Sequence, residues 1–291
     1  MPSNEQRREA AKRKLERQLE RRAQRAQRRR VLTVAGAVLA VVLVGGGIVG
    51  VYLYNRDDDD AAAADATTST TSPEPDAPAD LPAPNPRPAS VTCAYPPTPQ
   101  QPSARPVTPP RTDPVGTSPA TVSMSITTSQ GPIGVNLDNA HAPCTVSSFV
   151  SLAAQGYFDN TPCHRLTTQG IKVLQCGDPT GTGTGGPGYQ FANEYPTDQV
   201  DPTSAEAGRP ANYKRGLIAM ANAGPGTNGS QFFLVYGDSP LKPDYTVFGT
   251  IDDTGLATLD KVAAAGLADG DTSGDGKPAA NVIIQGARLD N

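Results

Sequence analysis

The residues best placed to act together lie within positions 216–236, where two apolar runs, 216–221 and 231–236, flank a segment rich in Gly, Pro and Asn. This pattern predicts two strands joined by a structured loop. Because successive strand side chains point to opposite faces, Phe232 and Phe233 must diverge, one into a core and the other onto the outer surface. An outer aromatic ring beside Asn222 and Gln231 predicts a small cleft with polar groups that bind a ligand.

Two other patterns are weaker indications of chemistry. Residues 181–186 satisfy the GxGxxG pattern of nucleotide-binding loops, but Pro187 follows them and no helix pattern does. Residues 269–274 begin like a calcium loop, but Ala280 stands where the bidentate glutamate is needed. We therefore expect no cofactor and no metal site.

The four cysteines show no CxxC or histidine-containing spacing typical of zinc ligands. An even number fits two disulfides, and the three possible connectivities stay open for Cys93, Cys144, Cys163 and Cys176. Strand parity argues against a bridge between Cys163 and Cys176 on neighbouring strands, because Cys163 shares a face with Arg165 and Cys176 faces away from Gln175.

Charge is unevenly distributed along the 291 residues. Residues 1–30 contain twelve Lys or Arg and four Glu, a charge of +8, so the net charge of −4 leaves −12 for the remainder. An acidic remainder argues against a nucleic-acid-binding domain there. Segment 1–30 consists of strong helix formers with few apolar groups, so we expect a solvated cytoplasmic helix; binding of RNA or anionic lipid is the alternative.

Residues 31–54 carry no charged side chain. As a helix rising about 1.5 Å per residue they span about 36 Å, enough to cross a hydrocarbon layer of about 30 Å. A cleavable signal peptide is the alternative, but its apolar region is shorter and ends in small residues, whereas this one ends in Tyr-Leu-Tyr. The preceding arginines predict a cytoplasmic N-terminus. We therefore expect a single-pass protein of the cell membrane with the rest of the chain outside the cytoplasm.

Residues 55–118 are first acidic and then rich in proline, with 16 prolines from Pro73 to Pro119. Such composition buries too little apolar surface to offset chain entropy, so we expect a disordered linker. From there to residue 291, short strand patterns and two helix patterns predict a mainly β domain. The helices are expected from Pro143 to Gly156 and at 256–265, a hairpin around Ser129 to Gly131, and other strands at 163–167, 173–176, 246–251 and 281–288.

Four segments resemble signature segments of the cyclophilins, the cyclosporin-binding family of peptidyl-prolyl cis-trans isomerases. They lie in the family's order at 158–166, 173–194, 220–233 and 244–251, and MANAGPGTNGSQFF at 220–233 is highly specific. The resemblance covers about residues 120–291 and implies a closed eight-stranded antiparallel barrel capped by two helices, with the active cleft on the outer face. A sandwich is the alternative architecture. The whole arrangement resembles the membrane-anchored cyclophilins of actinobacteria.

The resemblance also implies roles for individual residues. Arg165 matches the catalytic arginine, and the substrate-binding positions are matched by Gln175, Ala221, Asn222, Gln231, Phe233 and Leu241. Two extra residues between Arg165 and Gln175 place Lys172 where the family has a second phenylalanine. Val173 then stands at the position of a methionine, Pro240 at that of a tryptophan and Tyr245 at that of a histidine. We expect Ile171 or Val173 to supply the missing apolar wall, and His164 to be a hydrogen-bonded structural residue.

The function implied is isomerisation of prolyl bonds in exported polypeptides by a monomer, without a covalent step. A second hypothesis is a catalytically weak module that binds proline-containing segments, which Lys172 and Pro240 favour. A third is a structural anchor whose basic cytoplasmic helix carries the function. Neither the client proteins nor the effect of Lys172, Pro240 and Tyr245 on cyclosporin binding follows from the sequence.

Overall fold

The computed structural model describes residues 78–290. The predicted basic segment 1–30 and transmembrane helix 31–54 lie outside the described residues. Within 78–290, no helix combines the length and the apolar character needed to cross a membrane. The elements at the N-terminal side are β1 (Ala79–Asp80), β2 (Ser90–Val91), β3 (Val115–Gly116), β4 (Thr121–Thr128), β5 (Gly131–Asp138), α2 (Pro143–Ala154), β6 (Thr161–Pro162), β7 (Arg165–Thr167) and β8 (Lys172–Cys176).

The remaining elements follow the long loop after β8. They are the 3-10 turn η1 (Thr197–Gln199), β9 (Ala211–Tyr213), β10 (Leu217–Met220), β11 (Phe232–Gly237), β12 (Ser239–Leu241), β13 (Val247–Ile251), α3 (Asp253–Ala265), the 3-10 turn η2 (Ala268–Gly270), β14 (Asp275–Gly276) and β15 (Ile283–Leu289). The predicted hairpin, both helices and the predicted strands are present, with α3 beginning three residues earlier than expected because Asp252 caps its N-terminus through the N–H of Gly255.

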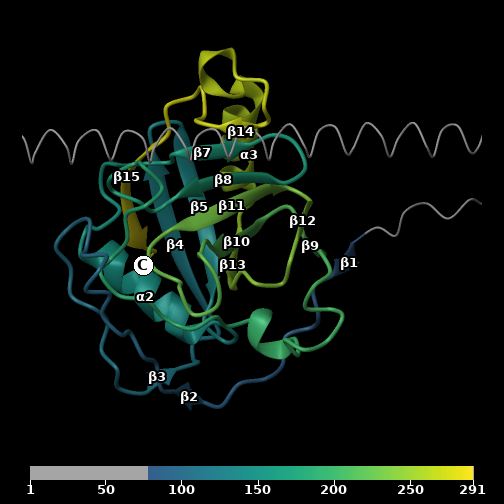
Figure 1. The fold of residues 1–291 in the computed structure, drawn as a ribbon. Coiled ribbons are helices and arrows are strands. Elements are labelled where there is room, and N and C mark those ends of the chain that lie inside the picture. Colours follow the sequence, from purple (N-terminus) through teal and green to yellow (C-terminus); the bar gives the residue numbers. More distant parts are fainter. Residues whose placement is uncertain (1–77, 291) are drawn as a thin grey trace, which may run out of the picture. The chain divides into compact units, whose positions relative to one another are not determined.

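Ten strands form one curled sheet in the order β14-β7-β8-β11-β10-β13-β5-β4-β15-β6 (Figure 1). The predicted closed barrel of eight strands is therefore wrong, since β14 and β6 are free ends of the ladder. The chain at 161–167 is the segment that could have closed it. It is interrupted at Cys163 and His164, between β6, which pairs with β15, and β7, which pairs with β8. The N–H groups of Cys163 and His164 donate to the carbonyls of Val282 and Gln175.

Two apolar clusters lie on opposite faces of this sheet. The main core holds Phe149, Phe158, Phe232 and Phe248, whose rings pack between the sheet and the helices. Helix α2 packs against β15 and β5, and α3 packs against β5 and β11; Figure 1 shows α2 near the lower end of the sheet and α3 near the upper end. The second cluster, around Phe233, lies on the outer face. The expected divergence of Phe232 and Phe233 is confirmed.

Residues 78–118, which we name the N-terminal strap, are ordered against the domain. This part of the predicted disordered linker is corrected by the structure: β1 pairs with β9, and Cys93 is bonded to Cys144 of α2. Tyr95 is buried between the rings of Tyr189 and Phe191. Composition was misleading because a proline-rich strap needs few partners for its own backbone and can be held by a covalent bond and a few buried side chains. Residues 55–77 lie outside the described part.

The second disulfide joins Cys163 and Cys176, so the pairing that strand parity argued against is present. The prediction was wrong because Cys163 does not lie on a continuous strand. It sits in the break between β6 and β7, where the alternation of side chains is interrupted. The bridge therefore connects the residue two positions before Arg165 with the residue directly after Gln175.

Candidate active site

Three neighbouring strands place the central predicted residues in one row across the sheet. Arg165 on β7 lies opposite Gln175 on β8, and Gln175 lies opposite Phe233 on β11. The row continues from Phe233 to Ala219 on β10. Directly opposite residues in neighbouring strands share a face, so Arg165, Gln175 and Phe233 all face outward, with about 4.8 Å between successive strands.

The outer cluster forms an apolar patch beside this row. Phe233 is 5% exposed and packs with Val173, while Leu241, Tyr245 and Ala221 are partly buried against them. The ring of Tyr245 meets that of Phe233 edge to face, with centroids 5.6 Å apart and an interplanar angle of 82°. Val173 and Ile171, from which we expected an apolar wall, both pack into this cluster. Lys172 is exposed, and its side chain lies against Gly237 instead.

A chain of hydrogen bonds fixes the polar residues of the row. The Nε and Nη2 groups of Arg165 donate to the two carboxylate oxygens of Asp275, each at 2.7 Å, and Nη1 donates to Oε1 of Gln175 at 3.1 Å. The amide of Gln175 donates in turn to Oε1 of Gln231 at 2.9 Å. Since each amide accepts on one side and donates on the other, the orientation of both glutamines is defined.

This series of hydrogen bonds ends at the glycine-rich loop 181–186. Nε2 of Gln231 donates to the carbonyl oxygens of Gly183 and Gly185 at 2.9 and 3.0 Å. Asp178 holds this loop by accepting from the N–H groups of Thr180, Gly183 and Gly185. Partial burial acts to raise the pKa of Asp178, but these hydrogen bonds outweigh it and keep the pKa below its ordinary value. The segment that matched a nucleotide-binding pattern therefore serves as a wall of the site.

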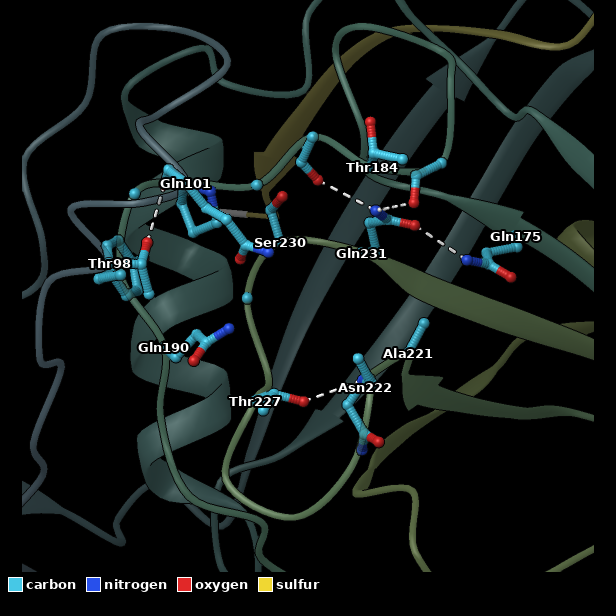
Figure 2. Close-up of a pocket in the computed structure, with 18 residues that line it drawn as sticks. Thr98, Gln101, Gln175, Thr184, Gln190, Ala221, Asn222, Thr227, Ser230 and Gln231 are labelled. Atoms are coloured by element: carbon cyan, nitrogen blue, oxygen red, sulfur yellow. Dashed lines mark hydrogen bonds between the residues drawn. The ribbon is translucent and has the colours of Figure 1, made fainter. Parts of the chain in front are cut away.

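A pocket of about 300 Å³ lies beside Gln175 and Gln231 (Figure 2). It is lined by Gln175, Ala221, Asn222, Gln231 and the glycine-rich loop, whereas Phe233, Leu241 and Tyr245 belong to the outer apolar cluster. Thr98 and Gln101 of the N-terminal strap line its other side, held there by the hydrogen bond from the Thr98 N–H to the Gly188 carbonyl. Ala221 lines this pocket and also packs against the outer apolar cluster.

Asn222 organises the loop between β10 and β11. Its amide nitrogen donates to the carbonyl of Asp244 at 2.9 Å, and its side-chain oxygen accepts from the N–H of Gly224 at 3.1 Å. Within residues 78–290, the backbone N–H and C=O of Asn222 have no hydrogen-bond partner. These two groups are therefore available to form hydrogen bonds with an extended chain.

The electrostatics of the site centre on a permanent cation. The hydrogen bonds that Arg165 donates to Asp275 raise the pKa of Arg165 further and lower the pKa of Asp275, so both are charged near neutral pH. Burial lowers the pKa of His164, so its ring is neutral there. The expected hydrogen bond of that ring is missing at Nδ1, which is buried without a partner in the described structure.

The structure brings all nine predicted residues to this face, and their roles stay predictions. Sequence reasoning missed three contributors: Asp275, the carbonyls of the glycine-rich loop, and the strap residues Thr98 and Gln101. No local signal could have revealed Asp275, because it lies 110 positions after Arg165. The strap carried one usable signal, Cys93, whose bonding to the domain would have argued against disorder.

The comparisons with known proteins indicate one family. The family model "Cyclophilin type peptidyl-prolyl cis-trans isomerase/CLD" matches residues 123–289. The chain is 55% identical over 298 residues to the "Probable peptidyl-prolyl cis-trans isomerase B" of Mycobacterium leprae, covering 100% of both chains. It is 60% identical over 199 residues to the protein of that name in Mycobacterium tuberculosis, covering 68% of this chain and 64% of the relative.

One solved structure, a cyclophilin type peptidyl-prolyl cis-trans isomerase of Cryptosporidium parvum, is 31% identical and covers 59% of this chain and 98% of its own, with a TM-score of 0.47. The family model spans more than half of the 291 residues, and the relative from M. leprae covers the whole chain. Taken together, the match over 123–289 and the 55% identity to the relative from M. leprae show that this chain belongs to the cyclophilin-type peptidyl-prolyl cis-trans isomerases.

Proposed function

We propose that Arg165 catalyses prolyl isomerisation in this enzyme by donating a hydrogen bond to the twisted amide. Rotation about a peptide C–N bond is resisted by about 18–20 kcal/mol of lost resonance, and no bond has to break to lower that barrier. At the twisted state the prolyl nitrogen becomes pyramidal and regains a lone pair. A guanidinium can donate to that lone pair, whereas planar amide nitrogen accepts poorly, so the contact favours the transition state.

The required acceleration exceeds what one hydrogen bond supplies. Shortening isomerisation from tens of seconds to milliseconds needs roughly 10⁴-fold, or about 5.5 kcal/mol. A charge-assisted hydrogen bond contributes about 1.5–3 kcal/mol. We attribute the remainder to binding: the apolar cleft around Phe233 holds the proline ring, while the free backbone groups of Asn222 and the amide of Gln175 hold the flanking chain.

The observation that carries this proposal is the row Arg165, Gln175 and Phe233. It sets a fixed cation and an apolar ring on the same face, two strands apart. This spacing suits a substrate whose proline ring contacts Phe233 while its amide nitrogen faces the guanidinium. The cleft supplies everything the step requires, since the reaction transfers neither atoms nor electrons.

The test is a protease-coupled assay on a proline-containing tetrapeptide with the full chain. Arg165→Ala should lower kcat/KM by at least tenfold, because it removes a contact made mainly in the transition state. Arg215→Ala is a matched control: Arg215, which precedes β10, also forms a two-point ion pair, with Asp260 of helix α3. Wild-type activity in a folded Arg165→Ala protein, checked by circular dichroism, would show that the mechanism is wrong.

The rival function is a module that binds proline-containing segments with little turnover. The exposed Lys172 and Pro240, which replace aromatic positions of the family, favour it. The same assay separates the two: a binding module gives peptide affinity with little acceleration, and Arg165→Ala leaves that small rate unchanged.

We further propose that the substrates are exported polypeptides and that the enzyme is anchored in the cell membrane through residues 31–54, with the isomerase outside. The supports are the uncharged run of 24 residues after an arginine-rich segment and the two disulfides of the domain. Protease added to intact cells should digest the isomerase domain and spare residues 1–30. Protection of the domain would mean that the orientation is reversed.

A further inference from the structure

The contact between Arg165 and Asp275 stands apart from the other ion pairs of the domain because it acts on the guanidinium of the proposed catalytic residue. Both oxygens of Asp275 accept at 2.7 Å, one from Nε and one from Nη2. Such two-point geometry fixes the plane of a guanidinium, which a single hydrogen bond cannot do. Gln175 accepts from the third nitrogen, Nη1, at 3.1 Å.

The partners of Arg165 determine how many of its N–H donors remain for the substrate. A guanidinium carries five N–H donors, one on Nε and two on each of the other nitrogens. Asp275 and Gln175 occupy three of them. One N–H on Nη1 and one on Nη2 are left, and these are the donors that a prolyl amide can meet. The two partners therefore decide which part of Arg165 faces the cleft.

The loop that carries Asp275 is itself tied to the strand of Arg165. Strand β14 pairs with β7, with Asp275 opposite Thr167 and Gly276 opposite Leu166, and the N–H of Thr168 donates to the carbonyl of Gly274 at 2.8 Å. Figure 1 shows this loop, in yellow, rising beyond β7 at the upper edge of the sheet. Ser273 donates from its hydroxyl to the carbonyl of Asp275 at 3.0 Å. The carboxylate is thus held by backbone pairing rather than by a free loop.

We propose that Asp275 is a positioning residue for isomerisation, which holds the Arg165 guanidinium in the orientation that presents its two remaining N–H groups to the prolyl amide. This inference rests on the proposed role of Arg165. Asp275 then takes part in catalysis through Arg165, although it lies outside all four segments that carry the family resemblance.

A purely structural role does not account for this contact. The side chains are 40% and 51% exposed, and ion pairs so exposed contribute little to the stability of a fold. The ion pair does restrain the orientation of the Arg165 guanidinium. An arginine side chain has many rotamers, and without a restraint it would spend only part of its time in the productive one. Removal of Asp275 should therefore reduce turnover while it leaves folding nearly unchanged.

The experiment measures kcat and KM of the full chain for a proline-containing tetrapeptide in four variants. Asp275→Asn keeps the shape of the side chain but replaces one acceptor by an amide. Its matched control is Asp269→Asn, which removes the same charge from the same loop at an exposed position where asparagine also tolerates the positive φ of 57°. Arg165→Ala and the double variant Arg165→Ala with Asp275→Asn complete a cycle.

We expect Asp275→Asn to lower kcat/KM at least fivefold, mostly through kcat, and Asp269→Asn to stay within twofold of the wild type. In the Arg165→Ala background, Asp275→Asn should change kcat/KM by less than twofold, because a positioning residue has nothing left to position. A structural role predicts the same fold loss in both backgrounds, and that result would overturn the inference, as would wild-type or higher activity of Asp275→Asn. Wild-type activity of Arg165→Ala would instead refute the proposed role of Arg165 itself.

Discussion

The two disulfides of the domain should separate stability from activity. Cys93 and Cys144 are 51 positions apart, whereas Cys163 and Cys176 are 13 apart. In the chain-entropy account, removing the longer cross-link costs about 4 kcal/mol and removing the shorter one about 3 kcal/mol. Replacement of both cysteines of a pair by alanine is the cleaner perturbation, because serine would place a hydroxyl at buried positions such as Cys93 and Cys176.

The effects on catalysis should fall in the opposite order. The Cys163–Cys176 bridge encloses the opposed pair Arg165 and Gln175, so its loss loosens the two strand ends that set the guanidinium against its glutamine. The Cys93–Cys144 bridge holds the N-terminal strap, which reaches the site only through Thr98 and Gln101 at the rim of the pocket. A short peptide that ends before this rim should be turned over normally without it.

The measurements are urea unfolding followed by circular dichroism, and kcat/KM for a tetrapeptide, for the wild type and both double-alanine variants. We expect the loss in the free energy of unfolding to be about 1 kcal/mol larger for Cys93 with Cys144 than for Cys163 with Cys176. Activity should fall severalfold only in the latter variant. Equal stabilities of the two variants would refute the loop-length argument. A larger loss of activity on removal of Cys93–Cys144 would refute the assignment of the strap to the rim.

Two further predictions concern Glu194 and Pro240. Burial raises the pKa of Glu194 despite hydrogen bonds from Thr145 and Cys144. The protonated carboxyl therefore contributes fully to stability below the pKa of the unfolded state, about 4.3. This contribution is lost as the pH rises through the raised pKa of the folded state. Urea unfolding from pH 4 to 7 should therefore show wild-type stability decreasing relative to Glu194→Gln; an increasing difference would contradict the raised pKa. Pro240 offers neither the aromatic face nor the N–H donor of the tryptophan found in many cyclophilins, so cyclosporin should inhibit this enzyme weakly and Pro240→Trp about 30- to 1000-fold better. Nanomolar inhibition of the wild type, or no gain in the variant, would contradict the alignment of the cleft.

Local patterns were sufficient where the deciding forces act over a few residues. Strand alternation sent Phe232 inward and Phe233 outward, and turn residues placed the loop between β10 and β11. The start of α2 at Pro143 and the end of α3 before Gly266 also followed from the residues themselves, because proline suits the first helical turn and glycine the position after the last.

Helix α2 illustrates a feature that no local pattern contains. Its N-cap residue, Ala142, makes no side-chain cap, and the N–H groups of Cys144 and Thr145 donate instead to the carboxylate of Glu194, about 50 positions later in the chain. This long-range cap leaves a buried carboxylate at the helix N-terminus, where the helix dipole favours negative charge.

The sequence by itself determined the family of this protein, its two helices and main strands, and nine residues that the structure brings together on one face of the sheet. Only the tertiary structure decided that the sheet ends openly at β6 and β14, that the strap is ordered, how the cysteines pair, and that Asp275 holds Arg165. The reason is physical: helix and strand formation depend on side chains a few positions apart, which sequence periodicity records. Disulfides, ion pairs and sheet closure depend on which distant segments the folded chain brings within a few ångströms of one another, and no periodicity encodes that distance.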